Sequence, residues 1–249
     1  MTDRVECKLK AKELLRGRWE NAVGACLLFF VSTFLLSFLL SPIPVFGWII
    51  IALISTFLTG SFIKYCIKLN ETEGKVKYLE CLISFKTTLK ILACDILIGL
   101  VVGIGWIIFT MIFSVAFIAS QSIVVIIVVL IILVALGFFI EAILFPVPMI
   151  LTEDEGVGVM EAIEMSFNIT KGYRWKYIVM NLSFIGWMIL SFLTFGIGML
   201  WLQPYMMLTY YLFYKGIRAI ISSYTLKYFT KFTAKKFFNL IKSLCNRYC

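Results

Sequence analysis

Six long apolar runs dominate this chain and leave little choice of fold. They occupy residues 22–40, 46–63, 91–118, 123–151, 177–193 and 197–214. A helix needs about 20 residues to cross the hydrocarbon core of a bilayer, and more when it is tilted. Hydrophobic residues make up 61% of the chain and charged residues 15%, which is too apolar for a soluble domain. We therefore predict an all-α bundle of six membrane-spanning helices.

The charged residues fall almost entirely between these runs, and on alternate connections. The connections 41–45, 119–122 and 194–198 carry no charge. The other four segments hold all 23 Lys and Arg residues; they are 1–20, 64–90, 153–176 and 215–249. Lys and Arg are enriched on the cytoplasmic side of membrane proteins. We therefore expect a multi-pass protein of the cell membrane, with both termini and both long loops in the cytoplasm.

The chain divides into three parts by composition. Residues 1–20 form an amphipathic cytoplasmic segment that places Val5, Leu9 and Leu15 near one helix face, and residues 21–217 form the six-span domain. No small-x-small site follows the first run, so we expect a spanning helix and not a cleaved signal. Residues 218–249 form a basic amphipathic tail, whose lysine face comprises Lys227, Lys231, Lys235 and Lys242.

The expected partners follow from this charge pattern. A basic tail beside a membrane binds anionic lipid of the bilayer, and the alternative is a docking helix for another membrane protein. The net charge of +9 would suggest nucleic acid in a soluble protein. No soluble face with base-reading side chains is visible, so we expect no nucleic-acid partner.

The chain lacks the residues that most catalytic and metal sites need. It contains no His, its seven Cys include no C-x-x-C pair, and no phosphate-binding, serine-hydrolase or zinc-protease motif occurs. The acidic stretch at 152–155 is interpreted as a solvated turn and helix start. We therefore expect no catalytic residues, no metal and no cofactor.

Four polar residues inside the apolar runs form the candidate site. They are Asp95, Glu141, Asn181 and Gln203. A carboxylate at the bilayer centre costs at least about 2.5–3.5 kcal/mol, so such residues face the protein interior or water. For Asp95 the alternative is wetting from the cytoplasm or pairing with Lys90, and Gln203 could simply satisfy the helix broken by Pro204.

Small residues near these positions predict close helix packing. Gly99 and Gly103 follow Asp95 at four-residue spacing, and Gly137 lies one turn before Glu141. Ser183, Gly186 and Trp187 share one face of the fifth run. Asn181 points away from that face, so we predict a hydrogen bond from Asn181 to another span.

The fifth run starts with a segment of basic and aromatic residues. Its members are Lys171, Tyr173, Arg174, Trp175, Lys176 and Tyr177. Lys and Arg hold the inner surface of a membrane, and Tyr and Trp lie at headgroup level. We predict that these six residues anchor the run at the interface.

Two blocks of the sequence carry a family resemblance. Residues 8–19 read K-x-x-A-K-E-x-L-x-G-x-W, and residues 166–187 contain KGYRWK followed by LSFIGW. With them the whole chain resembles a family of uncharacterised multi-span bacterial membrane proteins, common in Gram-positive organisms and defined as a domain of unknown function. The resemblance implies a location in the cell membrane and supplies no activity or catalytic residues.

Two functions remain open from the sequence. The first hypothesis is a non-enzymatic membrane protein that assists assembly, export or protection at the envelope. The alternative is a small-solute or ion transporter with its site around Glu141, Asn181 and Gln203, because transporters place sites beside broken helices. A continuous polar cavity touching Glu141 would favour transport, and a solid, lipid-like core there would contradict it. An intramembrane enzyme would need Asp95 and Glu141 within a few ångströms of each other.

Overall fold

Helices form all the regular structure in the described part of the chain. The computed structural model describes residues 3–40, 46–72, 76–120 and 123–248. In chain order the elements are α1 (Arg4–Leu15), α2 (Trp19–Leu40), α3 (Phe46–Glu71), the short 3₁₀ helix η1 (Tyr78–Cys81), α4 (Phe85–Ser120), α5 (Ile123–Leu144), α6 (Val147–Glu153), α7 (Val159–Thr170), α8 (Arg174–Leu182), α9 (Ile185–Leu193) and α10 (Met199–Tyr248). The predicted all-α class is confirmed for these residues.

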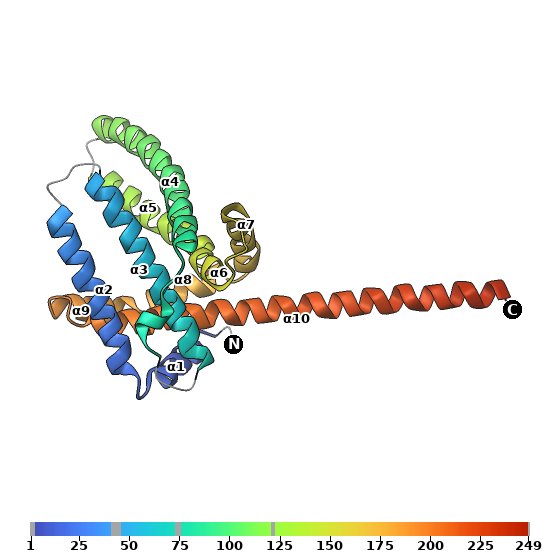
Figure 1. Ribbon diagram of the computed structural model, residues 1–249. Coiled ribbons are helices and arrows are strands. Elements are labelled where there is room, and N and C mark those ends of the chain that lie inside the picture. The colour runs from blue at the N-terminus through green and yellow to red at the C-terminus, as the bar shows by residue number, and fades with distance from the viewer. Residues whose placement is uncertain (1–2, 41–45, 73–75, 121–122, 249) are drawn as a thin grey trace.

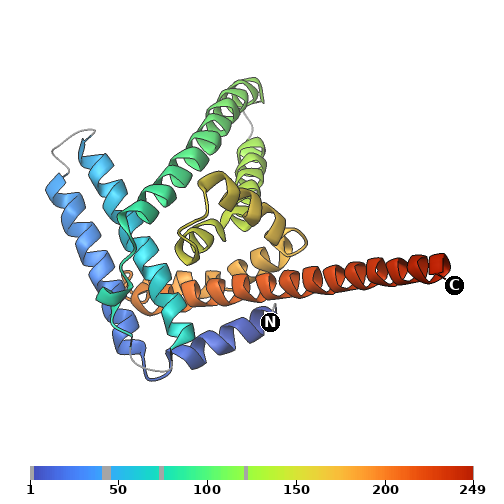
Figure 2. The same cartoon turned by 45° about the vertical axis from the view of Figure 1, so that its right-hand side comes forward.

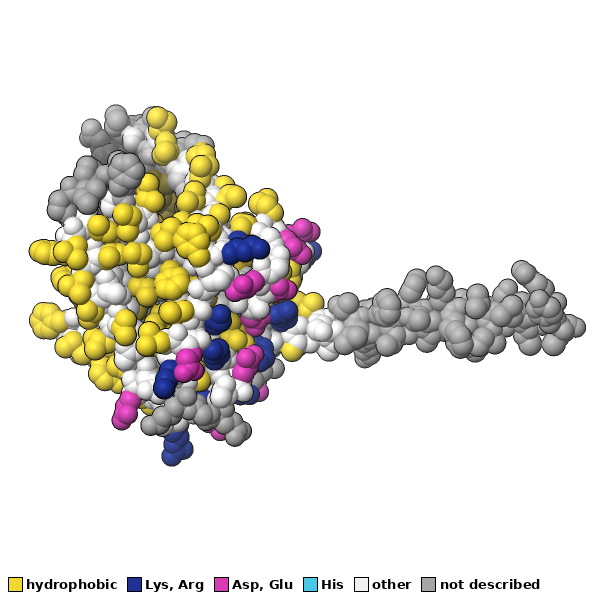
Figure 3. Space-filling model, in the orientation of Figure 1, with side chains coloured by type: hydrophobic (Ala, Val, Ile, Leu, Met, Phe, Trp, Pro, Cys, Tyr) yellow, Lys and Arg dark blue, Asp and Glu magenta, His cyan; other side chains and the backbone are white. Residues whose placement is uncertain are grey.

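The helices form hairpins that diverge from a common base (Figures 1 and 2). The α2–α3 pair and the α4–α5 pair extend in different directions, and α10 passes across the base of both. Hydrophobic side chains cover much of the face that carries α2, α3 and α4 (Figure 3). Charged side chains gather on the side from which α10 projects. On this face the hairpins are therefore mainly apolar, and the charged side chains lie toward their base.

Five helical segments in the described residues are long and apolar enough to cross a membrane. They are Trp19–Leu40, Ile49–Glu71, Phe85–Met111, Ile127–Glu153 and Arg174–Leu193. The sixth predicted span, 197–214, is not confirmed. It forms the start of α10, where Gln203, Pro204 and several Tyr residues lower its hydropathy. A helix at the centre of a bundle packs against other helices, so it can be less apolar than one that faces lipid.

α10 is this central helix. It packs against α1, α2, α3, α7 and α9, and its buried residues include Leu208, Thr209 and Phe213. It continues without a break from Met199 to Tyr248 and projects away from the other helices (Figure 1). The backbone therefore has no interruption at the domain boundary expected after residue 217. The predicted lysine face of the tail lies outside the residues whose side chains are described.

α1 packs against α10 through a face different from the predicted one. Cys7, Ala11 and Leu15 are each 0% exposed, and their spacing of four residues places them on one side of the helix. Val5 and Leu9 are exposed instead, so they do not pack against α10, and their placement on an interfacial face stays a prediction. Small side chains at positions 7 and 11 let α1 lie close to α10.

Candidate ligand-binding site

Glu141 is the centre of a hydrogen-bonded network that joins three helices. On α5, its Oε1 accepts hydrogen bonds from the Tyr177 hydroxyl at 2.9 Å and from Asn181 Nδ2 at 3.2 Å, both on α8. The Tyr210 hydroxyl, on α10, donates to Asn181 Oδ1 at 2.8 Å. Asn181 is 7% exposed. The predicted hydrogen bond from Asn181 to another span is confirmed, with a partner on each side.

Two helices of the network end close to their polar residues, and the third contains a proline. Pro146 separates α5 from α6 just after Glu141, and α8 ends one residue after Asn181. Pro204 lies inside α10, next to Gln203. Proline removes a backbone donor and displaces the carbonyl one turn earlier. The three polar side chains therefore lie beside two helix ends and one proline within a helix.

A cavity of about 290 Å³ opens beside this network. Glu141, Asn181 and Gln203 all line it, together with Phe138, Ile185, Met188, Met206, Met207 and Tyr210. Three of the four residues predicted as an intramembrane polar site therefore meet in one place. The apolar and thioether side chains around them give the cavity an adaptable wall.

Asp95 lies across a second cavity from this cluster. Asp95 and Glu141 both line a space of about 370 Å³ between α4, α5 and α6, as does Gly137. No hydrogen bond joins the two carboxyl groups in the described part of the chain. Glu141 borders both cavities, so it is the one predicted residue that each of them shares.

Lys90 does not pair with Asp95 as the alternative supposed. Its Nζ donates at 2.6 Å to the carbonyl oxygens of both Glu155 and Val157, in the connection between α6 and α7. Among the described residues, the ion pair recorded is Arg218 with Glu153. Lys90 therefore ties α4 to the α6–α7 connection and leaves the Asp95 carboxylate facing the cavity.

A family model described as a protein of unknown function (DUF975) matches residues 1–220. The chain belongs to this DUF975 family. No curated protein and no solved structure matches it.

The four glycines predicted to pack against helices in this DUF975 member do not lie at close contacts between described residues. A Cβ added to Gly99, Gly103, Gly137 or Gly186 would meet no described atom within 4 Å. Close packing at these four positions is therefore not seen within the described part of the chain, where the hairpins diverge, and the packing role stays a prediction. Ser183 does make a contact between helices, since its Oγ accepts a hydrogen bond from Lys8 Nζ at 2.6 Å. Trp187 is 55% exposed and lines another cavity.

The basic and aromatic segment at 171–177 contains both exposed and buried residues. Lys171, Trp175 and Lys176 are exposed, as expected of interfacial residues. Tyr173 is half-buried, and the Arg174 guanidinium lies 4.5 Å from the ring centroid of Phe167. Tyr177 is 1% exposed, so its assignment as an anchor was wrong. It lies inside the bundle because its hydroxyl bonds Glu141.

A second polar cluster was missed in the sequence. Glu153, at the end of α6, accepts hydrogen bonds from Tyr211 at 3.2 Å and Tyr214 at 3.0 Å, and it pairs with Arg218. The interpretation of 152–155 as a fully solvated turn was therefore wrong for Glu153. The spacing of Tyr211, Tyr214 and Arg218 by three and four residues places them on one face of α10. That spacing was the available signal.

The described residues contain no group of three or more Cys, Asp and Glu that could hold a metal. The five described cysteines are free and buried: Cys7, Cys26, Cys66, Cys81 and Cys94. Burial raises the pKa of the Cys7 thiol to about 11. Since the thiolate is the reactive form, Cys7 is an unreactive apolar side chain at neutral pH.

Proposed function

We propose that this protein is a membrane transporter for a small cation, without enzymatic activity. The observation that carries the proposal is the shared cavity of Glu141, Asn181 and Gln203. These side chains come from α5, α8 and α10 and meet close to Pro146, the end of α8 and Pro204. Transporters place their sites beside discontinuous helices, whose unwound backbone binds the solute.

The chemistry of the cavity favours a cation. Glu141 Oε1 is held by Tyr177 and Asn181, whereas Oε2 accepts no hydrogen bond from the described residues. Tyr210 lines the same cavity, and an aromatic ring attracts a cation at its face. The second carboxylate, Asp95, borders Glu141 from the adjoining cavity. One carboxylate beside the rings of Phe138 and Tyr210, in a mostly apolar cavity, suits a small organic cation.

The proposed arrangement in the membrane has six spans, with α8–α9 and the first part of α10 as the last hairpin. It places both termini in the cytoplasm of a cell membrane. The support is the absence of charge in the connections 41–45, 119–122 and 194–198, together with the basic segments that flank the spans. In this arrangement the projecting half of α10 lies in the cytoplasm.

The proposal is tested in proteoliposomes that contain the full chain. Radiolabelled tetraethylammonium, a small permanently charged cation that crosses protein-free bilayers poorly, serves as the probe, with an inside-negative potential imposed. We expect protein-dependent uptake that Glu141→Gln reduces at least tenfold, because the substitution removes the charge and keeps the shape. The control is Glu164→Gln on α7, whose side chain is exposed. Uptake equal to that of protein-free liposomes, or uptake unaffected by Glu141→Gln, would contradict a cation site at Glu141.

A second candidate is a protein that assists the assembly, export or protection of the envelope. It is favoured by the α4–α5 hairpin. Only 12% and 6% of the residues in its two most apolar segments are buried within the chain. Photo-crosslinking from Leu100 and Ile131, which are 60% and 62% exposed, distinguishes the two. A discrete protein adduct at both positions supports assistance of another membrane protein, and adducts with lipid alone contradict it.

A further inference from the structure

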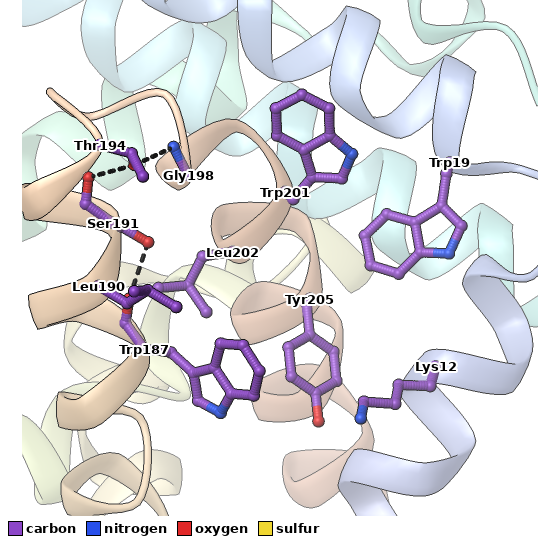
Figure 4. Close-up of a pocket in the computed structure, with 10 residues that line it drawn as sticks. All are labelled: Lys12, Trp19, Trp187, Leu190, Ser191, Thr194, Gly198, Trp201, Leu202 and Tyr205. Atoms are coloured by element: carbon purple, nitrogen blue, oxygen red, sulfur yellow. Dashed lines mark hydrogen bonds between the residues drawn. The ribbon is translucent and has the colours of Figure 1, made fainter.

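A separate aromatic cavity lies on the other side of the α9–α10 hairpin. It has a volume of about 370 Å³ and is lined by Lys12, Trp19, Trp187, Leu190, Ser191, Thr194, Gly198, Trp201, Leu202 and Tyr205 (Figure 4). Known ligand sites have volumes of about 300–1,000 Å³. None of its residues belongs to the two cavities that Glu141 borders. It is therefore a distinct space, with three of the chain's six Trp residues in its wall.

The turn between α9 and α10 forms one end of this cavity, and this end offers an apolar surface. The hydroxyl of Ser191 donates to the Trp187 carbonyl, and that of Thr194 to the Ser191 carbonyl. The Thr194 hydroxyl in turn accepts from the amide of Gly198. A Cβ at Gly198 would lie 2.8 Å from Ser191 Oγ, so glycine allows the helices to approach closely here. Because these hydroxyl and amide groups are hydrogen-bonded within the turn, they do not require a polar ligand.

The opposite end of the cavity is polar and cationic. Figure 4 shows the Trp187 indole nitrogen, the Tyr205 hydroxyl and the Lys12 ammonium directed toward the same end, away from the turn. Lys12 Nζ lies 5.8 Å from the centroid of the Tyr205 ring. Lys12 has no hydrogen bond or ion pair with the described residues, and its side chain is exposed. Three hydrogen-bond donors therefore lie at this end of the cavity. Among the described residues, no acceptor or anion neutralises the charge of Lys12.

The neighbouring cation on α1 is already engaged. Lys8 Nζ donates to Ser183 Oγ at 2.6 Å and lies 3.8 Å from the centroid of the Phe184 ring. Burial lowers the pKa of Lys8, and the positive charges of Arg4 and Lys12 lower it further. These interactions show that α1 presents concentrated positive charge to the α9–α10 hairpin. Lys12 is the member of this group that lines the cavity.

We propose that this cavity binds one anionic phospholipid, with its phosphate at Lys12, Tyr205 and Trp187 and an acyl chain along α9 toward the turn. The polar end matches a negatively charged headgroup, and the rings of Trp19 and Trp201 with Leu190 and Leu202 match a hydrocarbon chain. Indole and phenol side chains occupy the headgroup level of membranes. The seven helical rises from Trp187 to Thr194 extend for about 10 Å, which accommodates the upper part of an acyl chain.

Native mass spectrometry of the full chain in detergent tests this site. The probes are dioleoylphosphatidylglycerol, dioleoylphosphatidylcholine and inorganic phosphate. We expect one phosphatidylglycerol to bind, about fivefold more tightly than phosphatidylcholine, as a single lysine beside an anionic headgroup provides. Lys12→Gln should abolish this preference. Lys10→Gln, on the same helix but at another cavity, should retain it.

Three results would overturn the proposal. They are equal binding of the two lipids by the unaltered chain, an undiminished preference for phosphatidylglycerol in Lys12→Gln, and equal loss of preference in Lys10→Gln. The last would show that general surface charge selects the lipid. Competition by inorganic phosphate at concentrations similar to the lipid would also overturn it, because the acyl chain would then contribute nothing. The assay is independent of transport at Glu141.

Discussion

Replacing Tyr177 with alanine is expected to lower the free energy of unfolding by about 3–5 kcal/mol, the usual cost of truncating a buried aromatic residue. Its side chain is 1% exposed and stacks on Phe145 with ring centroids 4.1 Å apart. It also contacts the rings of Tyr210 and Phe213. Alanine would leave a cavity between α5, α8 and α10 and remove a hydrogen-bond donor from Glu141.

A conservative change separates packing from hydrogen bonding at this position. Tyr177→Phe keeps the stacked ring and loses the hydroxyl, so we expect a loss of about 0.6–2 kcal/mol, as for other hydrogen bonds between membrane helices. Trp175→Ala is the matched control on the same helix, because Trp175 is 72% exposed. Reversible unfolding of the purified chain in mixed micelles measures all three. Equal destabilisation by Tyr177→Ala and Trp175→Ala would show that Tyr177 does not pack in the core.

Glu153→Gln is expected to lower the free energy of unfolding by about 2 kcal/mol. Hydrogen bonds to a charged group contribute about 1.5–3 kcal/mol, and Glu153 accepts from Tyr211 and Tyr214. The Arg218 side chain is 49% exposed, so its ion pair with Glu153 contributes less than a buried pair would. Glutamine keeps one acceptor oxygen but turns an amide donor toward the tyrosine hydroxyls.

Its control is the neighbouring Glu155→Gln, because the Glu155 side chain is exposed and its carbonyl bond to Lys90 is unaffected. We expect a change within about 0.5 kcal/mol for this surface position. The same unfolding assay applies. A double variant with Arg218→Met measures the coupling between Glu153 and Arg218. If Glu153→Gln proves as mild as Glu155→Gln, α6 is not held to α10 through this carboxylate.

Much of the helical layout could be predicted because hydropathy and charge are properties of local sequence. Five of the six predicted spans reappear as long apolar helices. The run 197–214 differs because α10 is enclosed by other helices, and neighbours along the chain do not reveal enclosure. The close packing predicted at the glycines is not seen, for a related reason. A small residue permits close approach but does not supply a helix to approach it.

The candidate site was predictable as far as intramembrane polarity identifies it. Glu141, Asn181 and Gln203 were recognised because polar side chains inside apolar runs require partners, and they line one cavity. The hydrogen-bond partners of Glu141 and Asn181 on neighbouring residues, Tyr177 and Tyr210, were not recognised. A tyrosine near the end of a span serves equally well as an interfacial anchor or an internal donor. Only the tertiary arrangement distinguishes the two roles.

The continuity of α10 makes it a lever arm. Gln203 and Pro204 lie near one end of a single 50-residue helix, and Tyr248 at the other end is about 66 Å away along its axis. A tilt of one degree about Pro204 therefore displaces the far end by about 1 Å, at a rise of about 1.5 Å per residue. Small rearrangements beside the cavity are amplified along α10 into displacements at its distant end.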